Sequence, residues 1–209
     1  MASQEGRPAP RLTARGAATK ARIVEGAASL VHERGVAGTS LDAVMIATGT
    51  SRSQLYHYFA NKDALISEVI KTQLGRVIAA QEPSLREVTS WDGLQRWCDH
   101  LVAMTRATQG VGGCPLGSLV GELADRSDSA RHELVRSFDE WQSYLSTGFA
   151  TMRDNGELAA EADVDELALT MMSALQGGLL MAQTTRSARP LELALNMGLG
   201  HIAGYRKKK

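Results

Sequence analysis

Residues 39–62 decide the fold, and they read TSLDAVMIATGTSRSQLYHYFANK. Thr39 and Ser40 are candidate N-caps for a short, largely apolar helix. That helix ends at Gly49, a residue that suits the tight turn between two packed helices. Ser51 then provides a cap for a third helix. This order of helix, glycine turn and short helix is the helix–turn–helix pattern, whose second helix enters the major groove of DNA.

The start of this third helix carries side chains that suit base recognition, namely Ser51, Arg52, Ser53 and Gln54. Arginine pairs bidentately with guanine, and glutamine pairs in the same way with adenine. The two serines are short enough to let the backbone approach DNA. We therefore expect Arg52 and Gln54 to read bases.

The rest of the chain also predicts helices. A first helix begins at Thr19 and closes at Gly35, and a fourth runs from about Lys62 to just before Pro83. Later helical segments are expected at 91–108, 115–124, 129–154, 164–185 and 190–205. No alternating run of β-branched residues predicts a strand. The expected fold class is all-α, with about nine helices, and residues 1–18 are expected to form a flexible arm.

Composition narrows the class of protein. The chain has 209 residues, of which 44% are hydrophobic and 22% are charged, as in an ordinary globular protein. Its formal net charge is zero, yet eight basic and three acidic residues lie between Arg7 and Lys62. This asymmetry indicates a nucleic-acid face on one part of the chain, with solvated surface charge as the alternative.

Two cysteines, Cys98 and Cys114, occur in a chain without an apolar run of signal-peptide or membrane-spanning length. We expect free thiols in a cytoplasmic protein with no membrane contact.

Residues 19–78 resemble the tetracycline-repressor (TetR) family of bacterial regulators. The resemblance implies a DNA-binding domain at 19–62 and a ligand-binding and dimerisation domain at 63–205. The Lys-rich residues 206–209 are expected to form a solvated basic tail. The resemblance also implies double-stranded operator DNA and a small-molecule effector as partners. In similar proteins the positions of Tyr56, His57 and Lys62 touch phosphates or sugars, for which these side chains are suitable donors.

Some of these residues have a plainer interpretation. Thr39 and Ser40 are placed to donate to a phosphate at a helix N-terminus, but Thr39 and Ser51 also fit as simple caps. Gln54 and Asp42 depart from the commonest family pattern. Because a carboxylate repels phosphate, we expect Asp42 to point away from DNA.

The C-terminal two-thirds is rich in Met and Trp, most of which should be ordinary core. In similar proteins the effector cavity lies between the central helices of this part. The candidate ligand-binding residues are Trp97, Met104, Leu119, Trp141, Tyr144, Leu145, Met172, Leu175 and Gln176. An apolar or aromatic effector with one or two polar groups would fit such a site.

Cys114 precedes Pro115 in a stretch similar to one found in part of the family. Pro115 suits the first helical position, which would place Cys114 at an N-cap, where the helix dipole lowers a thiol pKa. Cys114 is therefore a candidate redox or electrophile sensor, and the alternative is a small buried residue at a turn.

The last two helices are apolar on more than one side, so each must be covered twice. We expect a twofold interface with a second copy of the chain, in which Gly177, Gly178, Gly198 and Gly200 permit close approach. A dimer would place two recognition helices in successive major grooves of a near-palindromic operator.

Other classes of protein find less support. The chain has no H-E-x-x-H, C-x-x-C, Walker or G-x-S-x-G motif, so we expect neither an enzyme nor a metal or cofactor site. An activator of the same fold, or a binding module without DNA affinity, remains open. We expect a repressor that its effector releases from DNA.

Overall fold

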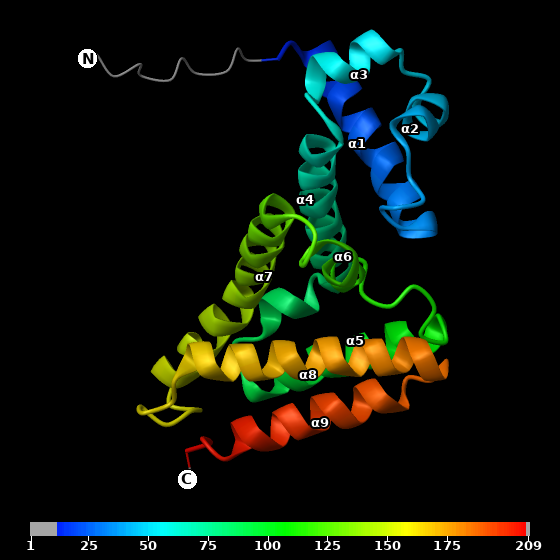
Figure 1. Cartoon of the computed structure of the whole chain (residues 1–209). Coiled ribbons are helices and arrows are strands. Elements are labelled where there is room, and N and C mark those ends of the chain that lie inside the picture. The colour runs from blue at the N-terminus through cyan, green and yellow to red at the C-terminus, as the bar shows by residue number, and fades with distance from the viewer. Residues whose placement is uncertain (1–11, 208–209) are drawn as a thin grey trace, which may run out of the picture.

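The computed structural model describes residues 12–207 and is helical. Within this range it contains nine α-helices, one 3-10 helix and no strand, in agreement with the expected fold class. The α-helices are α1 Ala14–Arg34, α2 Leu41–Thr48, α3 Arg52–Tyr58, α4 Lys62–Gln81, α5 Trp91–Ala107, α6 Gly117–Leu123, α7 Asp128–Asp154, α8 Val164–Thr185 and α9 Arg189–Ala203. Helices α1 to α3 occupy one end of the molecule, and α5, α8 and α9 occupy the other (Figure 1).

Helix α1 begins earlier than the sequence suggested. Thr13, not Thr19, is the N-cap, and its side chain accepts a hydrogen bond from the Gly16 amide. Residues 14–18 are therefore helical, whereas residues 1–11 of the expected arm lie outside the described residues. The Thr19 hydroxyl instead donates to the Arg15 carbonyl, which is how a threonine inside a helix bonds its backbone.

The turn between α2 and α3 follows the sequence prediction. Ser40 caps α2 by accepting from the Ala43 amide, and Gly49 ends the helix with φ of 60°, in the left-handed region. Ser51 caps α3. The turn and its two caps fix the direction in which α3 leaves α2.

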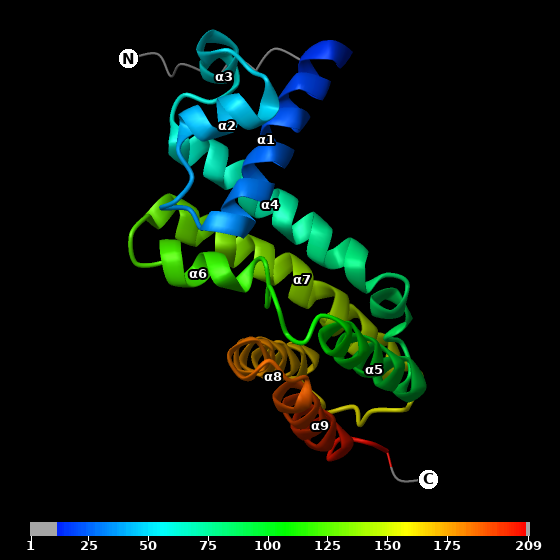
Figure 2. The same cartoon turned by 90° about the vertical axis from the view of Figure 1, so that its right-hand side faces the viewer.

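A small core joins α1, α2 and α3 to the start of α4. It includes the fully buried side chains of Ile23, Val44, Leu55 and Val69. Such burial contributes roughly 1.5–3 kcal/mol per large apolar side chain. Helix α4 then leads from this end of the molecule towards the other helices (Figure 2).

Helices α8 and α9 lie side by side at the far end (Figure 1). Two glycines make this close packing possible. A Cβ on Gly178 would lie 2.9 Å from the Leu191 Cα, and one on Gly198 would lie 3.1 Å from the end of the Met171 side chain. Of the four glycines expected to permit close approach, these two serve packing within the chain.

Two elements differ from expectation. A 3-10 helix at Ser84–Glu87 follows Pro83, where the sequence analysis expected no helix. Helix α6 starts at Gly117 and not at Pro115, after a turn at residues 115–116. Cys114 nevertheless occupies the expected cap-like position, since its Sγ accepts from the Gly117 amide at 3.2 Å and its carbonyl accepts from the Ser118 amide at 2.9 Å.

The chain's end is anchored as far as it is described. The Arg206 guanidinium lies 4.9 Å from the ring centroid of Trp91, and the Lys207 amide donates to the Glu157 carbonyl. Residues 208–209 of the expected basic tail lie outside the described range. Across the described helices, none is long and apolar enough to cross a membrane.

Candidate functional site

The outer surface of α3 exposes the residues that the sequence assigned to DNA. Leu55 is fully buried and holds the helix to the core, whereas Arg52, Ser53 and Gln54 are exposed. Tyr56 and His57 in the second turn are also exposed. The helix lies at the end of the molecule opposite α9 (Figure 1). The structure therefore groups these five side chains on or beside one accessible surface.

Ser51 and Gln54 form a reciprocal capping box. The Ser51 hydroxyl accepts from the Gln54 amide at 3.2 Å, and the Gln54 side-chain oxygen accepts from the Ser51 amide at 3.1 Å. Such a box stabilises the start of a helix. An adenine contact through both side-chain amide atoms of Gln54 would compete with this cap.

Arg52 has a carboxylate neighbour across the turn. Its Nη2 lies 3.6 Å from the Asp42 Oδ1, and the two side chains are 72% and 71% exposed. Asp42 thus lies beside the recognition helix, which corrects the expectation that it points away from the DNA-binding surface. An exposed ion pair is worth only about 0–1 kcal/mol, so this contact holds the Arg52 guanidinium only weakly.

Two residues expected at phosphates have structural contacts instead. Thr39 is only 3% exposed, and its hydroxyl donates to the Gly35 carbonyl at 2.8 Å, so its predicted phosphate contact is wrong in this conformation. The half-buried Lys62 donates to the Val36 carbonyl at 2.7 Å. Ser40 and Ser51 are exposed and serve as caps.

The Val36 peptide is held from both sides. While Lys62 of α4 donates to its carbonyl, Glu122 of α6 accepts from its amide at 2.7 Å and from the Ala37 amide at 3.4 Å. The turn between α1 and α2 is thereby tied to two other helices. We call Lys62, Val36 and Glu122 the turn clamp.

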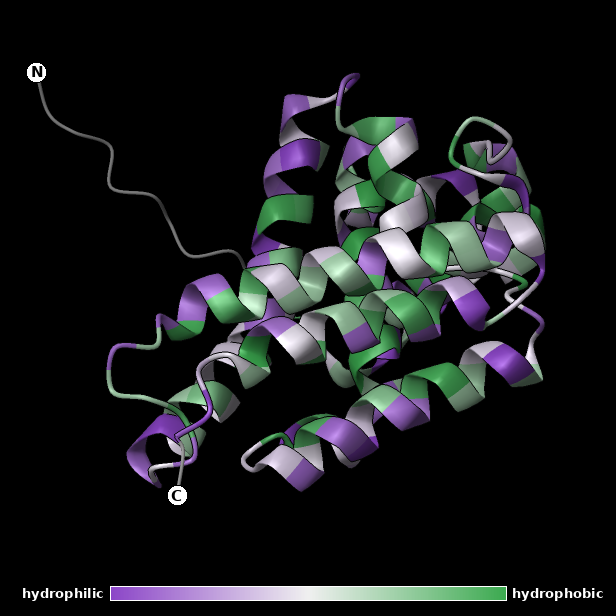
Figure 3. Cartoon of the chain, turned by 90° about the horizontal axis from the view of Figure 1, so that it is seen from below, coloured by the Kyte–Doolittle hydropathy of each residue, from purple (hydrophilic) through white to green (hydrophobic). Residues whose placement is uncertain are grey.

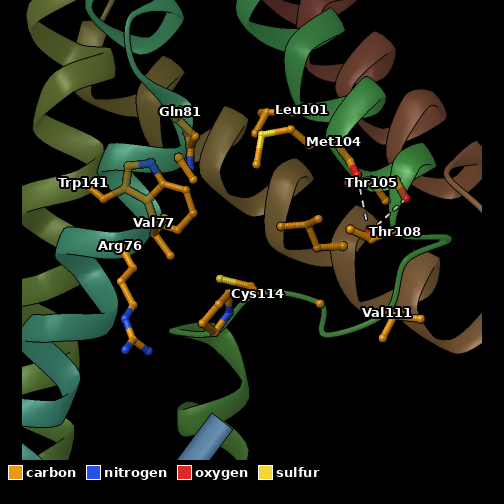
Figure 4. A pocket seen from close by; sticks show the side chains of 14 residues that line it. Arg76, Val77, Gln81, Leu101, Met104, Thr105, Thr108, Val111, Cys114 and Trp141 are labelled. Atoms are coloured by element: carbon orange, nitrogen blue, oxygen red, sulfur yellow. Dashed lines mark hydrogen bonds between the residues drawn. The ribbon is translucent and has the colours of Figure 1, made fainter. Parts of the chain in front are cut away.

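A cavity of about 310 Å³ lies between α4, α5, α7 and the segment before α6. Figure 4 shows Trp141 and Val77 on one side of it, Leu101 and Met104 on the other, and Cys114 between them. Its lining residues are Arg76, Val77, Ala80, Gln81, Leu101, Met104, Thr105, Thr108, Val111, Gly113, Cys114, Pro115, Trp141 and Leu179. The lining is mainly apolar and contains no carboxylate.

A second cavity of about 400 Å³ adjoins the first at Cys114. Its other lining residues are Gly117, Ser118, Val120, Phe138, Gln176, Gly177, Leu180 and Gln183. We refer to the two as the Trp141 cavity and the Gln176 cavity.

The sequence located only some of the cavity residues. Met104 and Trp141 line the Trp141 cavity, and Gln176 lines its neighbour. Tyr144 lines a different cavity of about 560 Å³ between α4 and α7, with Arg86 5.3 Å from its ring centroid. The remaining candidates line neither of these cavities and are buried in the core, which corrects their assignment: Trp97, Leu119, Leu145, Met172 and Leu175.

Helix α4 supplies a wall of the Trp141 cavity that the sequence analysis missed, through Arg76, Val77, Ala80 and Gln81. Gln81 is buried, and its side-chain oxygen accepts from the Trp97 indole nitrogen at 3.0 Å. Gln73 on the same helix is also buried but lines neither cavity, so a glutamine on this stripe did not by itself indicate a cavity wall.

Arg76 also faces the DNA-binding end. Its guanidinium forms an ion pair with Glu25 of α1 and donates to the Gln73 side-chain oxygen at 3.4 Å. In Figure 4 this guanidinium points away from the centre of the cavity. One residue thus joins the cavity wall to α1.

The structure contradicts the expected chemistry of Cys114. Burial raises the pKa of its thiol, although the Gly117 and Leu116 amides and the nearby Gln176 side chain oppose the shift. Burial outweighs the amides at this site, so the prediction of a lowered thiol pKa was wrong. Cys98 is also free, and burial raises its pKa to about 12.

The residues from 12 to 207 include no cluster of three or more histidine, cysteine or acidic side chains that could hold a metal ion.

Large apolar side chains on α8 and α9 are exposed. Leu180 is 65% exposed and Met197 is 69% exposed, and Leu169, Met181 and Leu193 are each more than half exposed. A Cβ on Gly177 or Gly200 would meet nothing within 4 Å. Figure 3 views the molecule from this side, where hydrophobic segments recur along the helices nearest the viewer.

Two family models match the chain. Residues 23–69 match the bacterial regulatory proteins of the tetR family, and residues 91–197 match the tetracyclin repressor-like C-terminal domain. The first match contains the helix–turn–helix, and the second contains α5 to α8 and part of α9.

Relatives and solved structures agree with these matches. The chain is 25% identical over 178 residues to the HTH-type transcriptional repressor DhaR of Mycobacterium sp., covering 84% of this chain and 87% of that protein. It is 24% identical to the repressor NemR of Escherichia coli, covering 85% and 90%.

A crystal structure of a TetR transcriptional regulator from Chloroflexus aurantiacus superposes with a TM-score of 0.76 at 26% identity, covering 94% of this chain and all of that one. The chain belongs to the TetR family of bacterial transcriptional regulators.

Proposed function

We propose that this regulator is a repressor that binds a near-palindromic operator as a homodimer and leaves it when a small apolar or aromatic effector binds. The observation that carries the proposal is α3, a capped helix whose exposed surface presents Arg52, Gln54, Tyr56 and His57. Arg52 and Gln54 would read bases, and Tyr56 and His57 would contact the backbone.

In this proposal residues 19–62 bind DNA, and residues 63–205 bind the effector and the second copy of the chain. The helical part before Thr19 extends the first of these. A cytoplasmic location, where bacterial DNA lies, belongs to the same proposal.

The effector would bind in the Trp141 cavity, whose size and apolar lining suit a small molecule. Two connections lead from this region to the DNA-binding end. Arg76 pairs with Glu25 of α1, and α6, which follows Cys114, carries Glu122 of the turn clamp. A ligand that fits only one arrangement of α4 and α6 would therefore bias the position of α3, which is a coupling free energy between two sites.

The exposed apolar surface of α8 and α9 supports a dimer of the expected kind. Monomeric proteins seldom expose a contiguous apolar patch of this type without a partner. A second copy related by a twofold axis would cover Leu180, Met197 and their neighbours, and would bring two copies of α3 to one operator.

The repressor assignment is favoured over activator by the relatives DhaR and NemR, each of which is named as a transcriptional repressor. The sensor role considered for Cys114 loses its chemical basis, since burial raises the pKa of the thiol and disfavours the reactive thiolate.

Mobility-shift assays on DNA flanking the protein's own gene would test the proposal across a salt series. We expect a shift whose affinity falls steeply with salt, because phosphate contacts release counterions. A promoter–reporter fusion should lose expression when the regulator is present. Salt-independent binding, or reporter expression that rises with the regulator, would contradict the proposed function.

A further inference from the structure

The Trp141 indole nitrogen is a buried donor that lacks a hydrogen-bond partner among the described residues. The side chain is 1% exposed and lines the Trp141 cavity. A buried N–H without an acceptor is unfavourable, and native structures seldom leave one unpaired. An acceptor supplied by a ligand in this cavity would satisfy it.

Only one other buried side-chain polar atom in residues 12–207 lacks a partner, and it is also a donor. It is the Gln176 Nε2, in the neighbouring cavity that meets the first at Cys114. Both orphan groups therefore require an acceptor, and neither offers one. The space between α4, α6, α7 and α8 is therefore bordered by two hydrogen-bond donors that lack an acceptor.

The Trp141 ring is held in position to act as a donor. Phe138 stacks on it with ring centroids 6.3 Å apart and an interplanar angle of 17°. Figure 4 shows the indole extending into the cavity from α7, opposite Leu101 and Met104. A donor on a fixed ring selects for an acceptor at one place in the ligand.

Charge narrows the class of ligand further. Arg76 is the one ionised side chain in the lining of the Trp141 cavity, and that lining has no Asp or Glu to balance a cation. A cationic ligand would lose hydration without gaining a counter-charge. An oxygen acceptor, neutral or anionic, faces no such penalty.

We infer that the effector is an apolar or aromatic molecule with a carbonyl or carboxylate oxygen that accepts a hydrogen bond from Trp141 Nε1. The apolar body lies along Val77, Leu101 and Met104, and a cationic amine is rejected. The inference rests on the proposed function, since it names the ligand class of that regulator. Trp141 is the specificity-determining residue.

Four matched probes test this class: benzylacetone, phenylbutyrate, butylbenzene and phenylbutylamine. Titrations are followed on full-length protein labelled with ¹⁵N at its three tryptophan indoles. Trp141→Phe identifies the Trp141 signal, and Trp91→Phe is the matched control because Trp91 lies beside Arg206, outside both cavities.

We expect the two oxygen-bearing probes to move the Trp141 indole signal downfield, as a new hydrogen bond does. At least one of them should bind about tenfold more tightly than butylbenzene, the scale of one good hydrogen bond to a buried donor. Trp141→Phe should reduce that ratio to below about threefold, and Trp91→Phe should preserve it.

Equal affinities for benzylacetone, phenylbutyrate and butylbenzene would overturn the inference, as would tightest binding of phenylbutylamine. A preference that survives Trp141→Phe, or no binding by any probe at millimolar concentration, would also overturn it. The change in the Trp141 indole chemical shift is measured on the wild-type protein, so this part of the test does not depend on whether a variant folds. A mobility-shift assay with operator DNA on the same preparation shows whether the protein still binds DNA. It therefore separates failure of this ligand inference from failure of the proposed function.

Discussion

Arg52 is the residue that we expect to contribute most to sequence recognition in the proposed DNA complex. Its guanidinium is exposed and held only by a 3.6 Å contact with Asp42. Arg52→Ala should cost about 1–3 kcal/mol of operator affinity and relax the preference at one base pair. Fluorescence anisotropy with operator variants measures both effects.

The matched control for this prediction is Arg96→Ala, because Arg96 is an exposed arginine on α5 that is likewise paired, with Glu87. It should leave affinity and base preference unchanged. If both variants lose affinity equally for every sequence, Arg52 acts as a general cation and does not read a base.

Lys62 requires a different prediction from the one that its place in the motif suggests. Because its ammonium donates to the Val36 carbonyl, Lys62→Met should lower the free energy of unfolding by about 1–3 kcal/mol. The slope of log affinity against log salt should stay the same, whereas loss of a phosphate contact would reduce it by about one. Denaturant unfolding and a salt series on operator DNA measure the two quantities.

Glu122→Gln provides the companion to this variant, since Glu122 holds the other side of the same peptide. It should also reduce stability without altering the salt slope. If the slope of log affinity against log salt falls for Lys62→Met but not for Glu122→Gln, then Lys62 contacts a phosphate of the DNA.

At the scale of helices, α1 is fastened to α4 by a pair of charges. Lys20 lies 2.8 Å from Glu68, and Lys71 also donates to that carboxylate. Burial acts to raise the pKa of Glu68, but the two lysines together hold it below its ordinary value. The stabilisation is therefore fully present above the ordinary carboxylate pKa and is lost as pH falls through the lowered one.

Acid should therefore remove the contribution of this pair, which is at most about 1 kcal/mol for a partly exposed site. The difference in unfolding free energy between wild type and Glu68→Gln should shrink as pH falls from about 6 to about 3. Urea titrations at each pH measure it. A difference that grows in acid would show that the pKa of Glu68 is raised.

The helix bounds were predicted correctly where the sequence has a clear capping residue or a helix-ending glycine. Val164–Thr185 begins after an Asp163 cap and matches the expected bounds, and Gly49 ends α2 as expected. The prediction failed where two signals competed. Thr13 and Thr19 both suit an N-cap, and the Pro, Gly and Ala residues around them obscured which one starts α1.

The exposed surface of α3 was more predictable than the cavity for a physical reason. On α3 one buried residue, Leu55, sets the helical phase, so the exposed side chains follow from it. Helix α8 is apolar on more than one side, and sequence alone cannot tell whether Met172 or Leu175 faces a cavity or the core. The lining from α4 depended on packing between distant segments.

For the whole molecule, the proposed dimer is the feature that would bring two copies of α3 to one operator. Met197 and Leu180 are exposed in the single chain, so Met197→Glu should not disturb its fold. It should convert the dimer to a monomer and weaken operator binding at least about tenfold, because two half-sites no longer share one protein. Light scattering coupled to gel filtration, with anisotropy, measures both.

Val135→Glu serves as the control, since Val135 is an exposed apolar residue on α7. It should leave the dimer and the operator affinity intact. A Met197→Glu protein that remains dimeric would place the interface elsewhere.

The central claim is that α3 reads base edges, twice, on one twofold-symmetric site. Selection of bound sequences from random DNA by the purified protein tests it most directly, with Arg52→Ala carried through the same rounds. The account predicts an inverted repeat with half-site centres about one helical turn apart, and a weakened preference at one position of each half-site in the variant. No enriched sequence, or the same repeat selected with unchanged preference by Arg52→Ala, would contradict it.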